Sequence, residues 1–222
     1  MTGFAGRTEP MSYRGIIFDL DGVLLSTDEY HYLAWKALAD RLGIPFDRER
    51  NGLLRGVSRM ESLEILLGKR GEAFSAEEKQ AMAAEKNARY RELLSRLTPA
   101  DVSGEVRRTL EELRALGLKL AVGSSSKNTP YILERVGLQD FFDAVADGNC
   151  ITHSKPHPEV FLKAAEGIGL PPAACLVVED AHAGVAAAAA GGFDCAAMGD
   201  AREDPGARWH LEAFSDLRGC LN

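Results

Sequence analysis

Short hydrophobic runs recur along the chain, and each of them ends in Gly, Ser or Asp. These runs lack the strict alternation of a half-exposed strand, which is typical of parallel strands that are buried on both faces. We therefore expect a parallel sheet. Its predicted strands cover residues 13–19, 118–124, 143–147, 175–180 and 193–199.

Helical patterns separate the later strands. In residues 103–116, the hydrophobic side chains of Val106, Leu110 and Leu113 recur at helical spacing. Further helices are expected over residues 128–136, 156–167 and 181–190, and the last of these is rich in alanine and ends at Gly191-Gly192. Strands that alternate with helices in this way predict an α/β fold with a doubly wound parallel sheet.

The segment between the first two strands has a different pattern, without a convincing strand. "STDE" at residues 26–29 fits a capping box for a first helix, a second helix is expected over 58–68, and "SAEE" at 75–78 begins a long third helix. We therefore predict a helical cap domain, inserted after the first strand. The predicted division is an N-terminal extension (1–10), a core domain (11–27 and 96–222) and the cap (28–95).

Composition and charge narrow the class of protein. The chain has 222 residues, which is enough for one domain with an insert. Its net charge of −7 argues against a nucleic-acid partner, because an acidic chain repels the phosphate backbone. It contains no apolar run of membrane-spanning length and no signal peptide. The four cysteines form no CxxC pair, which together with these features predicts a reduced, cytoplasmic location.

Polar residues with distinct chemistry follow the predicted strands, at the edge of an α/β sheet where ligands bind. They are Asp19 and Asp21 after the first strand, Ser124 after the second, Lys155 in the loop "HSKPHP", and Glu179 and Asp180 after the fourth. Several carboxylates in one place repel one another unless protons or a cation relieve the repulsion, and oxygen ligands favour Mg²⁺. "DLDG" by itself would fit a strand end and a turn, but the combination predicts an active site in which one aspartate attacks phosphorus and its neighbour handles a proton.

This order of residues resembles the haloacid dehalogenase (HAD) superfamily, whose pattern is DxD, Ser/Thr, Lys and an acidic pair. Within that superfamily, "LLRGVSRMESLEILL", "SSSKNTPYILERVGL" and "SKPHPEVFLKAA" resemble the β-phosphoglucomutase family, cap included. The resemblance implies a Mg²⁺-dependent enzyme that interconverts β-D-glucose 1-phosphate and glucose 6-phosphate through an aspartyl phosphate and glucose 1,6-bisphosphate. It also implies a monomer that acts on a small-molecule sugar phosphate. The acidic net charge and the lack of a membrane-spanning run lead us to expect no nucleic-acid or membrane partner.

The resemblance assigns a role to each matching position. Asp19 would be the nucleophile and Asp21 the general acid/base. The metal would be held by the Asp19 side chain, the Asp21 backbone carbonyl and Asp180, with Glu179 nearby. The remaining assignments are Ser124 and Lys155 on the transferring phosphoryl group, Arg59, Ser126, Lys127 and Asn128 on the other phosphate, and Thr27, His31 and Lys86 beside Asp21.

Three points remain open. The family usually has lysine at the position of Arg55, so this residue is given no role. His153, His157 and His182 lack convincing metal spacing and are interpreted as structural. A sugar-phosphate phosphatase on the same scaffold is the alternative function, and a phospho-acceptor receiver domain is a third hypothesis that the helical insert and the chain length disfavour.

Overall fold

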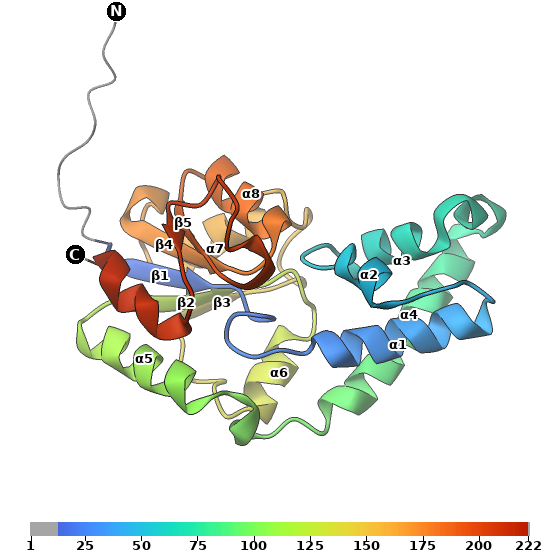
Figure 1. Ribbon diagram of the computed structural model, residues 1–222, viewed down its shortest axis with the longest axis horizontal. Helices are drawn as coiled ribbons and strands as arrows, with labels where there is room; N and C mark the ends of the chain where they lie inside the picture. The colour runs from blue at the N-terminus through green and yellow to red at the C-terminus, as the bar shows by residue number, and fades with distance from the viewer. Residues whose placement is uncertain (1–12, 222) are drawn as a thin grey trace, which may run out of the picture.

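A six-stranded parallel sheet forms the centre of the computed structural model, which describes residues 13–221 (Figure 1). The strand order is β3-β2-β1-β4-β5-β6, so β1 lies in the middle with β2 and β4 on either side. The strands are β1 (Gly15–Phe18), β2 (Lys119–Gly123), β3 (Ala144–Ala146), β4 (Cys175–Glu179), β5 (Asp194–Ala197) and β6 (Trp209–His210). The five predicted strands are confirmed, whereas β6 was missed because two residues are too few to produce a periodic pattern.

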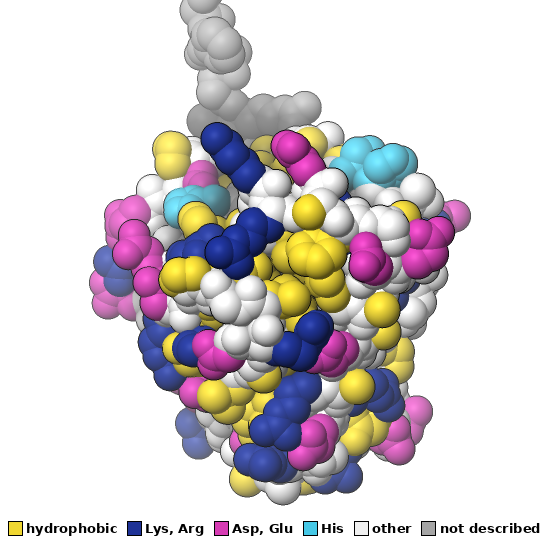
Figure 2. Space-filling model, turned by 90° about the vertical axis from the view of Figure 1, so that its right-hand side faces the viewer, with side chains coloured by type: hydrophobic (Ala, Val, Ile, Leu, Met, Phe, Trp, Pro, Cys, Tyr) yellow, Lys and Arg dark blue, Asp and Glu magenta, His cyan; other side chains and the backbone are white. Residues whose placement is uncertain are grey.

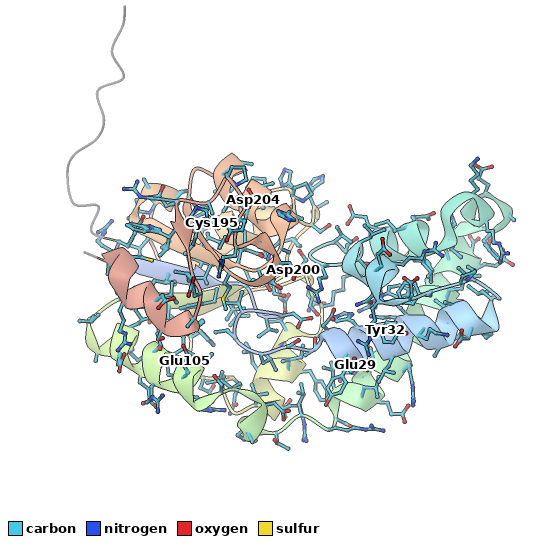
Figure 3. The ribbon with its side chains drawn as sticks, viewed as in Figure 1. Glu29, Tyr32, Glu105, Cys195, Asp200 and Asp204 are labelled. Atoms are coloured by element: carbon cyan, nitrogen blue, oxygen red, sulfur yellow. The ribbon has the colours of Figure 1, made fainter. Side chains whose placement is uncertain are left out.

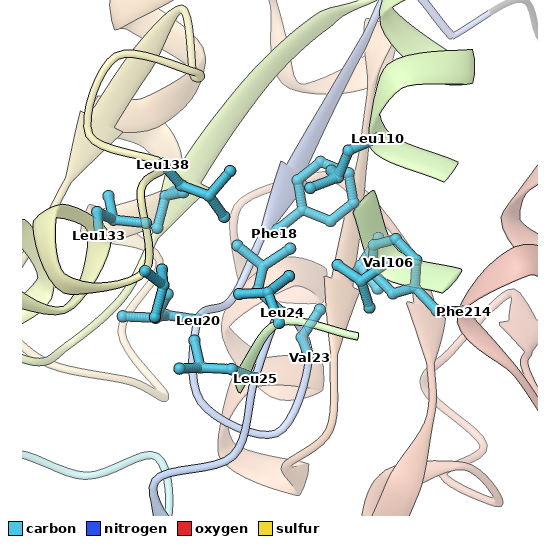
Figure 4. Packing of buried hydrophobic residues seen from close by; sticks show 14 of the residues in the cluster. Phe18, Leu20, Val23, Leu24, Leu25, Val106, Leu110, Leu133, Leu138 and Phe214 are labelled. Atoms are coloured by element: carbon cyan, nitrogen blue, oxygen red, sulfur yellow. The ribbon is translucent and has the colours of Figure 1, made fainter. Parts of the chain in front are cut away.

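Both faces of the sheet are buried. In β1, Ile16 and Phe18 pack in one hydrophobic cluster with helix α5 (Gly104–Ala115), while Ile17 packs in the opposite cluster with α7 (Glu159–Gly167) and α8 (His182–Ala190). Figure 4 shows Phe18 among side chains from other elements of the first cluster. Burial on both sides explains why the strands read as continuous hydrophobic runs.

The core helices follow the predicted segments closely. Helix α6 is Thr129–Arg135, and α5 and α8 each begin one residue after the predicted start. Helix α7 begins at Glu159 rather than at residue 156, with Pro158 as its N-cap. The short 3₁₀ helices are η1 (Gly68–Ala73), η2 (Pro99–Asp101), η3 (Pro172–Ala174), η4 (Gly199–Ala201) and η5 (Phe214–Leu221).

The helices from α1 to α4, between β1 and β2, form a cap beside the carboxyl ends of the strands (Figure 1). The cap consists of α1 (Asp28–Arg41), α2 (Arg48–Gly52), α3 (Arg59–Leu67), η1 and α4 (Ala76–Leu94). It has a hydrophobic cluster of its own, which includes Trp35, Leu38 and Leu63. The predicted N-terminal extension lies outside the described residues.

The capping motifs of the cap helices have different outcomes. Ser75 and Glu78 form the predicted capping box of α4, and Ser58 forms a second one with Glu61 at the start of α3. The capping box predicted at residues 26–29 is wrong: Thr27 is the N-cap of α1, and its side chain makes no capping hydrogen bond. The Thr27 hydroxyl is instead directed into the candidate site described below.

Other features of the described region agree with the sequence. The four cysteines are free, and Cys175 and Cys195 are buried, as their apolar surroundings predict. Within residues 13–221, none of the helices combines the length and apolar character that crossing a membrane requires. On the face in Figure 2, basic and acidic side chains are interspersed.

Candidate active site

The core and the cap enclose a cavity of about 1300 Å³ at the carboxyl ends of β1, β2 and β4. Both the core and the cap contribute to its lining. Of the predicted site residues, Thr27 lies behind the cavity wall, and the others line the cavity: Asp19, Asp21, His31, Arg59, Lys86, Ser124, Ser126, Lys127, Asn128, Lys155, Glu179 and Asp180. The structure therefore brings together residues that are more than 150 positions apart in the sequence.

Lys155 lies between two carboxylates at the bottom of the cavity. Its Nζ is 2.5 Å from Asp19 Oδ1 and also pairs with Glu179 Oε1, and Lys155 and Glu179 are almost fully buried. Burial opposes the charge of Lys155, but the two carboxylates outweigh burial and raise its pKa. Lys155 is therefore held as a cation beside Asp19, where an anionic group could be stabilised.

Glycines allow the acidic side chains to approach the neighbouring elements. Gly22 has a φ of +86°, and a Cβ atom at this position would come within 2.0 Å of Asp180 Oδ2. A Cβ on Gly184 in α8 would come within 2.0 Å of Glu179 Oε1. Gly22 and Gly184 are thus required by the close packing of the two carboxylates.

The carboxylates have the properties expected of a site for a hard cation. Burial, together with the negative charges of Glu179, Asp19 and Asp21, raises the pKa of Asp180 to about 8. A divalent cation would relieve this repulsion, and Mg²⁺ accepts a few carboxylate and carbonyl oxygens with water completing its shell. The donor set and the close approach of Asp180 to Gly22 therefore fit Mg²⁺.

Asp21 is fixed by two hydrogen bonds from one residue. The Thr27 backbone N–H donates to Asp21 Oδ1 at 2.6 Å, and the Thr27 hydroxyl donates to Oδ2 at 2.8 Å. Tyr90 Oη lies 2.7 Å from the same hydroxyl. Burial and the charges of Asp19 and Asp28 raise the pKa of Asp21 to about 6, although the bonds from Thr27 oppose this shift. A carboxyl group with such a pKa can both hold and release a proton near neutral pH.

A Lys–His pair lies next to Asp21. Lys86 Nζ is 2.8 Å from His31 Nδ1, and His31 Nε2 is 3.8 Å from Asp21 Oδ2. The Lys86 amine is also over the rings of Trp35 and Tyr90, at 4.6 and 4.5 Å. Burial and the nearby guanidinium of Arg59 hold the pKa of Lys86 well below its usual value, and burial and both cations lower that of His31. The lowered pKa values favour the neutral forms of both side chains, so the pair places polar groups beside Asp21 while burying less positive charge.

Arg59 faces the cavity from the first residue of α3. Its side chain is half-buried, and within residues 13–221 no carboxylate forms an ion pair with it. The loop after β2 lines the cavity with Ser126, Lys127 and Asn128. Asn128 is held by Asn87 and Arg91 of α4, with Asn128 Nδ2 donating to Asn87 Oδ1 at 2.9 Å. An unpaired arginine opposite these donors is suited to a phosphate.

Several functional contacts were missed by the sequence analysis. Tyr90 follows Lys86 by four residues, so helical spacing could have placed both on one face of α4. The cap–core contacts left no local signal: Ser154 donates to Glu61 Oε2 at 2.6 Å, and Arg55, which also pairs with Asp28 within the cap, pairs with Asp200 of the core. Figure 3 shows Asp200 on the side of the core that is near the cap.

Two histidines given a structural interpretation lie together at the cavity. His153 and His157 line it, and their ring centroids are 4.7 Å apart. His182, in contrast, does not line the cavity and pairs with Asp204 at 2.5 Å. No sequence pattern indicated that His153 and His157 lie together; a turn in which the His157 backbone N–H donates to the Ser154 carbonyl oxygen at 3.0 Å lies between them.

Comparisons with known proteins agree with this arrangement. Residues 13–192 match the family model described as haloacid dehalogenase-like hydrolase. A β-phosphoglucomutase from Bacillus subtilis strain 168 is 40% identical over 206 residues, which cover 92% of this chain and 91% of that protein. A fructose-1-phosphate phosphatase from Escherichia coli strain K12 is 32% identical over 184 residues, which cover 82% of this chain and 94% of that protein.

A solved structure shows the same fold at full length. The crystal structure of a β-phosphoglucomutase from Clostridium difficile superimposes with a TM-score of 0.89 and 35% sequence identity, covering 95% of this chain and 97% of that one. The match includes the cap as well as the sheet, because it extends over nearly all of both chains.

Proposed function

The chain belongs to the haloacid dehalogenase-like hydrolase family, and we propose that it is a Mg²⁺-dependent β-phosphoglucomutase. It interconverts β-D-glucose 1-phosphate and glucose 6-phosphate through an aspartyl phosphate and glucose 1,6-bisphosphate. The observation that carries this proposal is Arg59 on the cap, which forms no ion pair among the described residues 13–221 and lines the same cavity as Asp19 and Lys155 of the core. Arg59 and Lys155 thus provide two separate places to bind a phosphate, which matches an intermediate that is a sugar with two phosphates.

The phosphoryl group is transferred to Asp19. One carboxylate oxygen of Asp19 forms a bond to phosphorus while the bond between phosphorus and the sugar oxygen breaks. Negative charge spreads over the phosphoryl oxygens in the transition state, so catalysis depends on cations and donors already in place. Lys155, 2.5 Å from Asp19, and the buried Ser124 supply them.

Asp21 transfers the proton. Its carboxyl gives a proton to the sugar oxygen that leaves, and its carboxylate takes a proton from the sugar hydroxyl that next attacks the aspartyl phosphate. Both hydrogen bonds from Thr27 orient Asp21, while His31 and Lys86 support it from the cap. Thr27 lies in the segment that leads into the cap, and Lys86 lies in cap helix α4. The position of the cap therefore affects the position of the acid/base.

The second phosphate is held between the cap and the core. Arg59 offers a planar fork of donors, and the loop after β2 adds Ser126, Lys127 and Asn128. Closure around both phosphates excludes water, which favours transfer to a sugar hydroxyl over hydrolysis.

The metal belongs to the same site. Asp19, Asp180 and the Asp21 backbone carbonyl would hold Mg²⁺, with Glu179 nearby. When bound, Mg²⁺ supplies positive charge that offsets the carboxylates and the phosphoryl group. The raised pKa of Asp180 and the contact of Asp180 with Gly22 support this assignment.

A sugar-phosphate phosphatase is the second candidate function. The E. coli fructose-1-phosphate phosphatase covers most of this chain at 32% identity, so the two activities occur among close relatives of this chain. The phosphatase would use the same Asp19 and Asp21, with water in place of the sugar hydroxyl as the acceptor.

The remaining assignments are part of the same proposal. The core comprises residues 11–27 and 96–222 and the cap residues 28–95. The protein acts as a monomer on a small-molecule sugar phosphate in the cytoplasm, and its four free cysteines suit that reducing compartment.

A coupled assay tests the proposal. The protein is supplied with β-glucose 1-phosphate, Mg²⁺ and a trace of glucose 1,6-bisphosphate, and glucose 6-phosphate and free phosphate are followed together. Glucose 6-phosphate in large excess over free phosphate, lost in Asp19→Ala, supports the mutase. Free phosphate as the main product assigns the phosphatase, and the absence of both products means that the substrate is a different one.

A further inference from the structure

Two imidazoles from the loop before α7 converge with the carboxylate of Glu159, the first residue of that helix. His153, His157 and Glu159 each offer a ligand atom, and these atoms all lie within 4.8 Å of one another. Within residues 13–221 this is the only group of three or more His, Cys, Asp or Glu side chains that comes together so closely. Its residues play no part in the phosphoryl transfer described above.

The carboxylate of this group is held in place by the backbone. Glu159 Oε2 accepts hydrogen bonds from the N–H groups of Thr152, at 3.1 Å, and His153, at 2.8 Å. The same oxygen is 3.3 Å from His153 Nδ1. A ligand that is already oriented by other hydrogen bonds loses less freedom when it binds a cation.

The second imidazole is positioned in a similar way. His157 Nδ1 accepts a hydrogen bond from the Glu159 backbone N–H at 3.3 Å, which leaves Nε2 as the nitrogen free to bind. The two rings are only 4.7 Å apart. Both histidines are exposed and can rotate to shorten the distances between ligand atoms.

The donor set differs from that of the carboxylate site. Imidazole nitrogen suits Zn²⁺ and the related cations Co²⁺ and Ni²⁺, whereas Mg²⁺ is bound through oxygen. Three protein ligands leave the remaining coordination positions to water. Two neutral imidazoles and one carboxylate would leave a net charge of +1 on a bound divalent ion.

We propose that His153, His157 and Glu159 form a binding site for one transition-metal cation of the zinc class. This site is separate from the carboxylates that would hold Mg²⁺. It lies at the cavity, since His153 and His157 both line it, and the two histidines flank Lys155 in the chain. A bound ion would connect the two sides of the loop that carries Lys155. The proposal does not depend on which sugar-phosphate reaction the protein catalyses.

Zn²⁺ titration of the full chain tests this site. Calorimetry is performed in a large excess of Mg²⁺, so that the carboxylates are occupied and only the nitrogen-containing site is measured. We expect one equivalent of Zn²⁺ to bind. Co²⁺ in place of Zn²⁺ should give visible absorption bands, which report nitrogen ligation independently. Absence of Zn²⁺ binding under these conditions would overturn the proposal.

Variants locate the site. His153→Ala and His157→Ala should each weaken Zn²⁺ binding by about tenfold or more. His210→Ala removes an exposed histidine elsewhere and should leave the affinity unchanged, as should Cys150→Ser, which removes the exposed thiol. Equal Zn²⁺ affinity in the wild type and in the double variant of His153 and His157, or loss of binding in Cys150→Ser, would contradict the assignment. Circular dichroism of each variant confirms that the fold is intact.

Discussion

Arg55 of the cap forms an ion pair with Asp200 of the core, across the opening of the cavity. Arg55 also pairs with Asp28 at the start of α1, where its Nη2 is 2.9 Å from Asp28 Oδ2. The guanidinium therefore connects the first cap helix, the loop before α3 and the core. This contact gives a structural role to the position where the family usually has lysine.

Removing the cap–core ion pair should loosen closure. Because Asp200 is largely exposed, Asp200→Asn should cost at most about 1 kcal/mol and raise the ratio of free phosphate to glucose 6-phosphate by up to about fivefold. Both products are measured in the coupled assay. Glu85→Gln is the matched control, since the Arg41–Glu85 pair lies entirely within the cap, and its ratio should not change. An equal rise in both variants would contradict the assignment.

Arg59 should be required for the second phosphate but not for the first transfer. Arg59→Ala should lower mutase turnover by about 100-fold or more, while phosphorylation of Asp19, followed by mass spectrometry, continues. Arg59→Lys keeps the charge without the fork and should recover only part of the activity. Full turnover in Arg59→Ala would exclude this residue as the anchor of the second phosphate.

The Thr27 hydroxyl should set the acidic limb of the pH–rate profile. This hydroxyl donates to Asp21 and so stabilises the carboxylate, which means that Thr27→Val should raise the pKa of Asp21 by about 0.5–1 unit. The acidic limb of kcat/KM then moves to higher pH. Tyr90→Phe removes the neighbouring hydroxyl but leaves the Thr27–Asp21 bond, and it should shift the limb less. A profile that does not move in Thr27→Val would separate that limb from Asp21.

The contribution of Asp21 and Asp180 to stability without metal should decrease as the pH rises, whereas the lowered pKa values of His31 and Lys86 act in the opposite direction. The pKa values of Asp21 and Asp180 in the folded protein, about 6 and about 8, lie above their ordinary value of 3.8, so the folded state binds more protons than the unfolded chain between these limits. This contribution is complete below about pH 4 and is lost as the pH rises through 6 and then 8. Each kcal/mol lost lowers the melting temperature by about 2–4 °C in a chain of this size.

Thermal unfolding in a chelator between pH 5 and 9 checks this slope. Asp180→Asn removes the group with the higher pKa and should flatten the upper part of the curve. Added Mg²⁺ should stabilise the protein more at pH 8.5 than at pH 5.5, because deprotonated carboxylates bind it. A melting temperature that rises from pH 6 to 8 in the chelator for the wild type, but not for Asp180→Asn, would reverse the expected sign.

Gly184 should be intolerant of a side chain. In Gly184→Ala the new Cβ would overlap the Glu179 carboxyl group, whose Cδ lies 1.9 Å away, so Glu179 would be pushed against Lys155. We expect a loss of about 1–3 kcal/mol in the free energy of unfolding and a marked loss of phosphoryl transfer. Urea unfolding and the coupled assay measure both. Gly104→Ala is the matched control, because its Cβ in α5 would meet no atom within 4 Å; equal effects in both variants would contradict the packing argument.

The hydrophobic pattern of the chain was enough to predict the α/β class and the order in which the candidate site residues follow the strands. Hydrophobic runs ending in polar residues were sufficient to locate β1, β2 and β4, because strands buried on both faces must be continuously apolar. Once these strands are parallel, their carboxyl ends meet at one edge of the sheet, so Asp19, Ser124 and Asp180 had to converge. A local rule was also sufficient for the capping box at Ser75, since the bonding atoms are only three residues apart.

The pairing of groups that are distant in the sequence became apparent only in the folded molecule. Thr27 lies within the predicted capping motif, but its buried hydroxyl contacts both Asp21 and Tyr90 and makes no capping hydrogen bond. Three further contacts depend on how the cap, the core and the loop before α7 lie in space. They are the Arg55–Asp200 ion pair, the Ser154–Glu61 hydrogen bond and the convergence of His153 with His157. Such contacts leave no periodic signal, because their energy depends on distances that are set when the hydrophobic cores of the cap and the sheet have formed.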